Sequence, residues 1–292
     1  MKNCCVIVTY NPDIENLINL VSSLHQSQLK VIVVDNASSQ KISFEKMNDV
    51  IVIALKDNLG IAKAQNIGIR KAIEVGCKKI IFFDQDSQID HDFIKNLISD
   101  YEKLKDKGNK VAAIGPQFID KKLGFYAPGL ILRKNGLVKK IDISKIKEPK
   151  KVDLIISSGS LIPIEVLQDV GLMNEDFFID YVDTEWCFRA LSKGYKIYVS
   201  PRAIMHHSVG DSTIRFMGLT CPVHSAFRRY YRVRNLFLMW NMRHIKKKWI
   251  IKMFVHNLIA QILLILTQKN RMAYIKYFIK SIRDGIKEIK RG

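Results

Sequence analysis

The chain has 292 residues, with 47 Lys and Arg against 28 Asp and Glu, and its formal net charge is therefore +19. Hydrophobic residues make up 48% and charged residues 26%, which excludes a disordered chain and allows one large core. The positive charge permits nucleic acid, anionic lipid headgroups or phosphorylated ligands as partners, and does not choose among them.

The cysteines and the N-terminus indicate the compartment. There are five cysteines, an odd number without zinc-like spacing, and several lie in apolar runs. Such residues are typical of buried free thiols in a reducing compartment. The N-terminus lacks a signal peptide, and we expect no segment apolar and long enough to span a bilayer. We therefore expect a cytoplasmic protein.

The first third of the chain alternates apolar, β-rich runs with amphipathic segments of helical period. Strands are predicted over residues 4–9, 29–34, 50–55 and 79–83, and helices over 14–24 and 61–75. This β-α-β alternation predicts a parallel sheet with helices on its faces.

Each of these four strands ends in polar residues. They are Thr9-Tyr10-Asn11, Asp35-Asn36, Asp57-Asn58 and Asp84-Gln85-Asp86. In an open α/β sheet such ends converge on one crevice, where ligands bind. The alternative is that Asn, Asp and Ser are simply turn formers, which turn chemistry would also favour. The glycine-rich dinucleotide and phosphate-loop motifs do not occur, so phosphate would have to be bound by metal and cationic side chains.

Asp84 and Asp86 follow the predicted strand over residues 79–83 with one residue between them. Two carboxylates at such a strand end suggest a divalent cation that carries a phosphorylated substrate. The alternative is that one of them caps the next helix, a position that Asp favours.

The middle of the chain continues the alternation. A helix is predicted over residues 90–107, a strand over 110–115 that ends at Pro116, and hairpins with a mobile loop over 117–150. A strand over 152–156 leads to Ser157-Ser158-Gly159-Ser160, and a helix begins at Pro163 and stops near Gly171.

A second acidic cluster lies at the predicted start of a helix near Asp183, with Glu185 in the same turn. A carboxylate there can act as a general base for a hydroxyl nucleophile, or it can simply compensate the helix dipole. Strands are predicted over 195–199 and 203–208. The second contains His206 and His207, which point to opposite faces of a strand, so at most one would face a site. His207 is either a metal ligand or structural.

Taken together, these motifs resemble the inverting nucleotide-sugar glycosyltransferases of family 2, which have the GT-A fold. The match covers roughly residues 3 to 240. Its signals are Val8-Thr9-Tyr10-Asn11-Pro12, Val33-Val34-Asp35-Asn36-Ala37-Ser38, Asn58-Leu59-Gly60 with Ala62, Ala64, Asn66 and Gly68, Asp84-Gln85-Asp86-Ser87, Ser158-Gly159-Ser160 and Tyr181-Val182-Asp183-Thr184-Glu185-Trp186-Cys187-Phe188-Arg189. The Asp-Gln-Asp-Ser form and His206-His207-Ser208-Val209-Gly210 look like bacterial rhamnosyltransferases in particular.

The resemblance implies a fold and a role for each matching position. The fold class is α/β, a Rossmann-like GT-A nucleotide-binding domain with a mostly parallel sheet, plus C-terminal amphipathic helices. Donor-binding residues would be Thr9, Tyr10, Asn11, Asp35, Asn58, Asp84, Ser158 and Gly159. Asp86 would bind Mg²⁺ or Mn²⁺. Apart from the resemblance, we assign His207 as a further metal ligand. Asp183 would be the base, although the family often has Glu-Asp where this chain has Val182-Asp183, and Asp180 is a fallback.

Four arginines follow within a predicted helical segment: Arg228, Arg229, Arg232 and Arg234. They could assist the diphosphate of the donor, and Arg232 is the one we assign to substrate binding. A solvated helix face is an equal alternative.

Residues 245–292 carry twelve Lys or Arg against Asp284 and Glu288, interleaved with aromatic and aliphatic residues. Helices of this kind are typical of interfacial membrane anchors, and the apolar core over residues 253–266 looks too short to span. Packing on the catalytic domain is an alternative, whereas nucleic acid lacks a binding motif. We therefore predict a catalytic domain over residues 1–243 and a membrane-associating tail over 244–292.

The predicted activity is transfer of a sugar, with L-rhamnose from dTDP-rhamnose as the favoured donor, to a saccharide or lipid-linked saccharide acceptor. The setting would be synthesis of bacterial cell-surface polysaccharide such as O-antigen, at the cytoplasmic face of the membrane, with a homo-oligomer possible. The alternatives are a UDP-sugar donor (galactofuranose or a hexose) and a non-catalytic module that binds nucleotide sugars or the membrane surface.

Overall fold

The computed structural model describes residues 3–44, 47, 49–120, 125–207, 212–216 and 219–291. For residues 120, 125, 207, 212–216, 219–222 and 291, only the backbone is described. By their contacts the residues form two units. Unit 1 comprises Met1–Ile131, Lys140–Phe178 and Val182–His207, and unit 2 comprises Leu132–Lys139, Ile179–Tyr181 and Ser208–Gly292. Unit 2 thus begins well before residue 244, and the functional division predicted at residue 243 stays a prediction.

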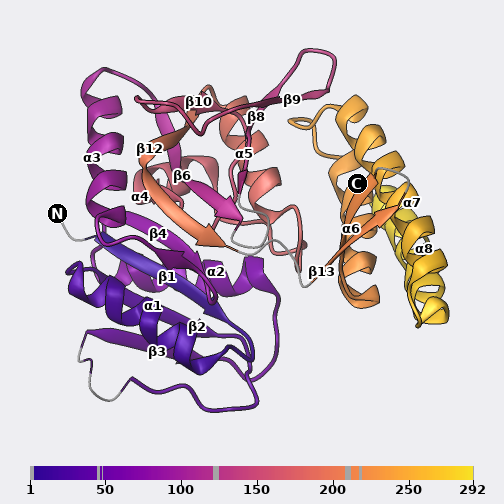
Figure 1. Ribbon diagram of the computed structural model, residues 1–292, viewed down its shortest axis with the longest axis horizontal. Helices are drawn as coiled ribbons and strands as arrows, with labels where there is room; N and C mark the ends of the chain where they lie inside the picture. The colour runs from indigo at the N-terminus through magenta and orange to yellow at the C-terminus, as the bar shows by residue number, and fades with distance from the viewer. Residues whose placement is uncertain are drawn as a thin grey trace. The chain divides into compact units, whose positions relative to one another are not determined.

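Unit 1 is built on one mixed sheet, which in the described residues has the strand order β10-β12-β6-β11-β4-β1-β2-β3 (Figure 1). The strands are β1 (Asn3–Thr9), β2 (Lys30–Asp35), β3 (Val50–Ala54), β4 (Lys79–Asp84), β6 (Val111–Asp120), β10 (Lys150–Val152), β11 (Leu161–Pro163) and β12 (Lys196–His207). The four N-terminal strands pair in parallel, as predicted, and β6 is parallel to β12. β11 and β10 run antiparallel to their neighbours.

Unit 1 also contains shorter strands and five helices, and the strands β8 and β9 each have residues in both units. β5 (Gln88–Ile89) pairs with β12 and β7 (Phe125–Tyr126) with β6, while β8 (Gly129–Leu132) and β9 (Val138–Ile141) form a separate pair. The helices are α1 (Ile14–Gln26), α2 (Ile61–Glu74), α3 (Phe93–Asp106), α4 (Ile164–Val170) and α5 (Val182–Ser192). The predicted helices over 14–24 and 61–75 are therefore confirmed.

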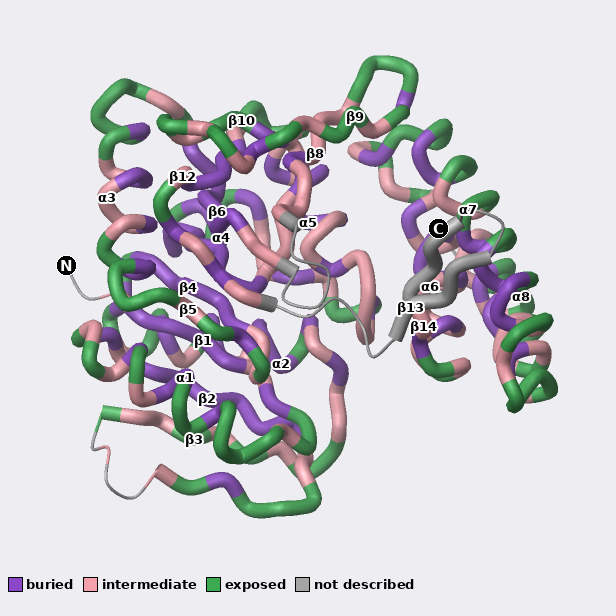
Figure 2. Tube along the Cα trace, in the orientation of Figure 1, coloured by how far each residue is buried: buried purple, intermediate pink, exposed green. Residues whose placement is uncertain are grey.

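The alternation of side chains along β1 decides which helices cover which face of the sheet. Cys5 and Ile7 lie in one buried cluster with Leu17 of α1 and Leu97 of α3. Val6 points to the other face, where α2 approaches so closely that a Cβ on Gly68 would overlap its side chain. Because both faces are covered, β1, β2 and β4 are almost wholly buried, as Figure 2 shows.

Four strand predictions are wrong in extent. β6 does not end at Pro116 but runs on to Asp120, because its ladder with β12 shifts register between Val199 and Ile204, opposite the proline. The same shift joins the two strands predicted over 195–199 and 203–208 into one, β12. The strand predicted over 152–156 is β10, which instead ends at Val152.

The expectation of free thiols is wrong for Cys4 and Cys77. These residues, on β1 and just before β4, are joined in a disulfide with their Cα atoms 6.0 Å apart. Cys5 and Cys187 are free and buried, and burial raises the pKa of both thiols.

Unit 2 is mainly helical. It contains α6 (Ala226–Trp240), α7 (Lys247–Thr267) and α8 (Arg271–Arg291), together with the hairpin of β13 (Ser212–Phe216) and β14 (Leu219–Val223). α6 and α8 pack closely, since a Cβ on Gly285 would overlap the ring of Phe237. The expectation that no segment could span a membrane is wrong by length and composition alone, because α7, with 21 residues, is long and apolar enough to cross a bilayer.

Candidate active site

The polar strand ends of unit 1 lie in one row. Thr9 of β1 is paired with Asp35 of β2, and Val8 is paired with Asp84 of β4. Asp35 is also paired with Ala54, after which the chain continues to Asn58. The prediction that these ends meet at one edge of the sheet is therefore confirmed.

Asp35 is the centre of a small hydrogen-bond network. Thr9 donates from Oγ1 to Asp35 Oδ1 over 3.0 Å, and the Ser38 hydroxyl donates to the same oxygen. The Ser38 backbone N–H donates to Asp35 Oδ2 over 3.2 Å. Thr9 and Asp35 are buried. This network fixes the carboxylate at the edge of the sheet.

Two loops are joined to this edge by side-chain amides. Asn11, whose φ is +46°, accepts at Oδ1 from the N–H and hydroxyl of Ser39 over 2.8 and 3.0 Å. Asn36 Nδ2 donates to Asn58 Oδ1 over 2.9 Å, and Asn58 Oδ1 also accepts from the Gly60 N–H over 3.0 Å. Asn11 and Asn58 thus shape the loops of the site.

Tyr10 is held by the residue that lies between the two aspartates. The Tyr10 N–H donates to Gln85 Oε1 over 2.7 Å, and Gln85 Nε2 donates to the Tyr10 carbonyl over 3.3 Å. The Tyr10 side chain is 49% exposed. The loop after β1 therefore presents an aromatic ring to solvent directly beside the Asp84–Asp86 segment.

Ser158 and Gly159 support the segment that carries Asp84 and Asp86. Ser158 Oγ accepts from the Asp84 N–H over 3.1 Å and lies 2.7 Å from Ser87 Oγ. Gly159 has φ +73°, and its N–H donates to the Phe82 carbonyl over 2.7 Å. Ser158 is buried, and these contacts position the loop that carries the two aspartates. Its assignment to the donor stays a prediction.

Neither Asp84 nor Asp86 caps the following helix. α3 begins at Phe93 with Asp92 as its N-cap residue, and β5 lies between. Asp86 is exposed and Asp84 half-buried. The helix-cap alternative is therefore wrong for both residues, and two carboxylates stand at the edge where ligands bind in such sheets.

β5 brings the end of β12 to this segment. His206 pairs with Gln88, and His206 Nε2 lies 3.4 Å from Asp90 Oδ1. The side chain of His207 lies outside the described residues, so its assignment as a metal ligand stays a prediction. Among the side chains that are described, no three His, Cys, Asp or Glu gather into a metal-binding group.

Asp183 lies in the first turn of α5, as predicted, and is half-buried. Its Oδ1 accepts from the Thr184 N–H over 2.7 Å. Glu185, in the same turn, is buried and binds Arg189 through two contacts of 2.9 and 2.7 Å. Glu185 is thus structural, and the assignment of Asp183 as the base stays a prediction.

Asp180, the alternative candidate for the base, is poorly suited to that role. In unit 2 its carboxylate binds Arg228 Nε over 3.1 Å and Arg232 Nη1 over 3.0 Å. Burial alone would raise the pKa of Asp180, but the guanidinium groups of Arg232 and Arg228 outweigh it and hold the pKa below its usual value. Arg232 therefore binds this acid, and its assignment to the donor stays a prediction.

The other two arginines of α6 are also paired. Arg229 is buried and donates to Asn257 and Gln261, and Arg234 donates to Asn235. A solvated helix face is therefore the wrong interpretation for Arg229.

The structure adds residues to which sequence reasoning gave no role. Ser38, Ser39 and Gln85 hold the loops that carry the predicted site. The only signal was their position within the polar strand ends. A partner 75 residues away, such as Tyr10 for Gln85, cannot be identified from one sequence.

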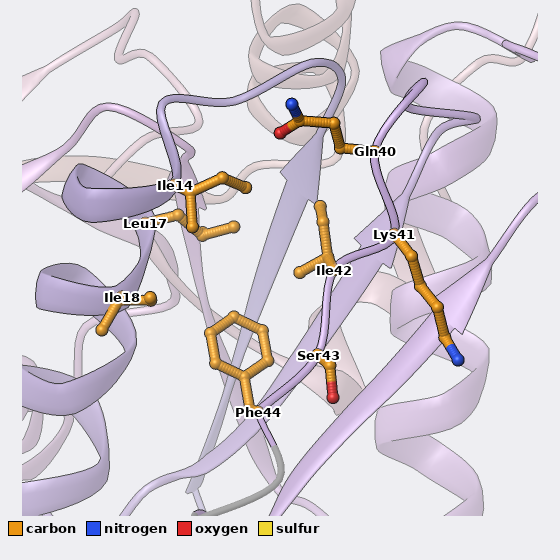
Figure 3. Close-up of a pocket in the computed structure, with 8 residues that line it drawn as sticks. All are labelled: Ile14, Leu17, Ile18, Gln40, Lys41, Ile42, Ser43 and Phe44. Atoms are coloured by element: carbon orange, nitrogen blue, oxygen red, sulfur yellow. The ribbon is translucent and has the colours of Figure 1, made fainter.

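Two hollows flank the loop after β2. One, of about 390 Å³, lies between Ile14 and Leu17 of α1 on one side and Ile42 and Phe44 on the other (Figure 3). Its described lining is largely apolar and contains no carboxylate. A second, of about 680 Å³, is lined by Asp35, Ser38 and residues of β3. Only the second adjoins the strand-end site.

Comparisons with known proteins agree with this geometry. The family model described as "Glycosyl transferase family 2" matches residues 4–170. The chain is 44% identical over 290 residues to "dTDP-rhamnosyl transferase RfbF" of Shigella flexneri, covering 98% of this chain and 96% of that one.

Solved structures share the fold at low sequence identity. Residues 1–349 of S. aureus TarS in complex with UDP-GlcNAc are 15% identical, with a TM-score of 0.57 over 99% of this chain and 82% of that one. GalNAc-T7 with UDP, GalNAc and Mn²⁺ is 17% identical, with a TM-score of 0.60 over 83% of this chain and only 48% of that one. These likenesses support the fold.

Proposed function

Because this chain belongs to glycosyl transferase family 2, we propose that it transfers L-rhamnose from dTDP-rhamnose to a saccharide or lipid-linked saccharide acceptor in the synthesis of bacterial cell-surface polysaccharide. The observation that carries the donor is the 44% identity to a dTDP-rhamnosyl transferase over nearly the whole of both chains. The chain is a glycosyltransferase, and the contacts of the site support roles for several of its predicted residues.

The donor would bind at the edge formed by β4, β1 and β2. The network of Thr9, Asp35 and Ser38 offers carboxylate and hydroxyl oxygens to a nucleoside. The exposed ring of Tyr10 offers a surface for the base. Asn11 and Asn58 fix the two loops beside this donor site.

The residues present fit a divalent cation such as Mg²⁺ or Mn²⁺. Asp84 and Asp86 are hard oxygen ligands at the strand edge, and no described cluster adds a third protein ligand. Mg²⁺ is typically bound by one or two carboxylates together with substrate phosphates, so a cation held by Asp86, with Asp84 and His207 beside it, suits a diphosphate donor. When bound, the cation neutralises charge on the departing diphosphate.

The transfer step then needs a base. The acceptor hydroxyl oxygen forms a bond to C1 of the sugar while the bond from C1 to the diphosphate oxygen breaks. The electron pair of that bond leaves on the diphosphate, and Asp183 takes the hydroxyl proton. Attack opposite the leaving group inverts C1. Asp183 suits this role because it is half-buried at a helix start, whereas Glu185 and Asp180 are committed to arginines.

The test is donor-dependent release of nucleoside diphosphate by the purified chain, with and without Mg²⁺ or Mn²⁺. The panel comprises dTDP-rhamnose, UDP-galactofuranose and UDP-hexoses, each with a lipid extract as the acceptor source. We expect turnover with dTDP-rhamnose and with no other donor of the panel. Turnover with only a UDP-sugar would overturn the assignment of the donor. Binding of donors without any turnover would favour a non-catalytic module.

A further inference from the structure

α7 exposes an apolar side, whereas a helix of a water-soluble protein exposes its polar side. In unit 2 the buried side of α7 carries, among apolar residues, Asn257 and Gln261, both almost wholly inaccessible. Its exposed side carries aliphatic residues.

The buried polar groups are joined by hydrogen bonds. Arg229 donates to Asn257 Oδ1 over 2.9 Å, to the Asn257 carbonyl over 2.7 Å and to Gln261 Oε1 over 3.1 Å. Asn257 Nδ2 donates to the Tyr181 hydroxyl over 2.9 Å, and Gln261 Nε2 to the Tyr274 carbonyl over 2.9 Å. These hydrogen bonds link α7 to α6 and α8. This side of α7 therefore faces the other helices of unit 2.

The outward side is a continuous aliphatic stripe. Six residues, each between 37% and 60% exposed, recur at helical spacing along the full length of α7: Ile251, Val255, Leu258, Ile259, Ile262 and Leu266. Single exposed aliphatic residues are ordinary on a soluble protein, but a stripe of six over about four turns marks a contact surface.

The charges around the stripe are all of one sign. Lys246, Lys247, Lys248 and Lys252 lie at its N-terminal end, and Lys269 and Arg271 follow its C-terminal end. Between residues 212 and 283 the sequence has fifteen Lys or Arg and not one Asp or Glu.

We propose that the outward stripe of α7, Ile251 to Leu266, inserts into the surface of an anionic phospholipid bilayer, with the lysines at its ends binding the headgroups. The apolar stripe then enters the acyl region, and the terminal lysines meet phosphates. The inference is independent of the donor sugar. It places unit 2 at the surface of an anionic membrane.

Two other arrangements fit the observations less well. A membrane-spanning α7 would carry the charged Arg229 and its polar partners into the hydrocarbon region, where they are costly. A second copy of the chain, paired through the same stripe, would bring lysine clusters against positive ends in either orientation. An anionic surface is the partner whose charge is complementary.

The test is co-sedimentation of the full chain with vesicles. One set contains equal parts of phosphatidylethanolamine and phosphatidylglycerol, and the other contains phosphatidylcholine alone. The wild-type chain is expected to sediment with the first set and to be released by salt. Val255→Ser with Ile262→Ser should lower the affinity at least about tenfold, because both side chains leave the inserted face. The matched control, Ile18→Ser with Ile73→Ser, removes two similarly exposed isoleucines of unit 1 and should change nothing.

A second variant tests the charge. Replacing Lys246, Lys247, Lys248 and Lys252 by Gln should lower affinity for the anionic vesicles at least about a hundredfold, since each cation near such a surface contributes about 1 kcal/mol. The matched control replaces Lys105, Lys107, Lys150 and Lys151 of unit 1 by Gln. It removes the same amount of charge and should lower the affinity for the anionic vesicles only slightly.

Three outcomes would contradict the membrane proposal. The proposal is overturned if the wild-type chain binds neither vesicle set, or if the stripe variant binds as well as wild type. It is also overturned if the wild-type chain is a dimer in solution that the stripe variant converts to a monomer. A thermal shift with dTDP-rhamnose, measured on the same preparations, separates failure of this proposal from misfolding and from failure of the donor assignment.

Discussion

Asn235 of α6 holds the backbone at Asp180. Its Nδ2 donates to the carbonyl oxygens of Ile179 and Asp180 over 2.9 and 3.0 Å, and the side chain is completely buried. Asp180 and the next residue, Tyr181, have φ values of +66° and +63°, a conformation that costs about 1–2 kcal/mol for residues other than glycine. The chain then enters α5, which carries Asp183. Asn235 thus stabilises a strained turn directly before the proposed base.

Asn235→Ala should therefore destabilise the protein by about 2–4 kcal/mol, because two carbonyl groups lose their donor in a buried place. Urea unfolding measures this. The matched control is Asn241→Ala, since Asn241 also donates to two carbonyls but is exposed, and its loss should cost less than about 1 kcal/mol. In the folded fraction of Asn235→Ala we expect kcat to fall more than KM rises. Equal stability of the two variants would contradict the role of Asn235.

Asp183→Asn should lower the transfer rate by about 10² to 10⁴, the usual contribution of a general base, and leave nucleotide binding largely intact. Steady-state kinetics and a thermal shift with dTDP measure the two effects separately. Asp180→Asn is the comparison: it should lower stability, because two arginines lose their counter-ion, while the pH profile of kcat keeps its shape. Unchanged transfer by Asp183→Asn would remove it as the base.

Removal of divalent metal by EDTA should abolish transfer, and added Mg²⁺ or Mn²⁺ should restore it. Asp86→Asn should raise the metal concentration needed for half-maximal activity by at least about tenfold, since a neutral amide replaces a charged oxygen ligand. The control is Asp92→Asn, an exposed acid six residues further on. If Asp86→Asn and Asp92→Asn need the same metal concentration, Asp86 is not a ligand.

The strands and helices of the N-terminal half could be predicted from sequence because their signals are local. The apolar run over residues 4–9 and the helical period over 61–75 match β1 and α2 to within a residue at each end. The meeting of Thr9, Asp35 and Asp84 then follows from the geometry of parallel strands, without knowledge of any contact.

What could not be predicted depends on partners distant in sequence. Asp180 reads as a candidate base until Arg228 and Arg232, 48 and 52 residues further on, are seen to bind it. β6 passes Pro116 because of an irregular register in its partner β12. In α7 the apolar composition is visible, but which side faces the protein depends on Arg229 of another helix.

Gly159→Ala should destabilise the protein by more than the same change at Gly194. Both glycines have positive φ, +73° and +79°, so alanine is strained at either position by about 1 kcal/mol. At Gly194 nothing lies within 4 Å of the new Cβ, whereas at Gly159 it would meet Pro116 Cγ at 2.7 Å and Met205 Sδ at 3.0 Å. We expect an additional cost of about 1–3 kcal/mol at Gly159. Thermal denaturation of the two variants decides, and equal losses would mean that Gly159 tolerates a side chain.

Acid should weaken unit 2 in two stages. Burial, together with Arg228 and Arg232, lowers the pKa of His224 to about 4, so that the unfolded chain binds a proton there more readily than the folded chain. The stabilisation is complete above the ordinary histidine pKa of about 6.5 and is lost as pH falls towards about 4, at up to about 1.4 kcal/mol per pH unit. Asp180, whose pKa lies below its usual value, adds a second loss when pH falls further, through its own folded pKa.

His224→Gln separates these stages, because glutamine is polar and does not titrate. Urea unfolding at a series of pH values should show a shallower slope between about pH 6.5 and 4 for the variant than for wild type. The loss below that window should persist, since Asp180 and its arginines remain. His244→Gln is the control, because His244 is also a histidine of unit 2 but is less buried. A slope for His224→Gln equal to that of wild type would show that His224 is not held neutral by its surroundings.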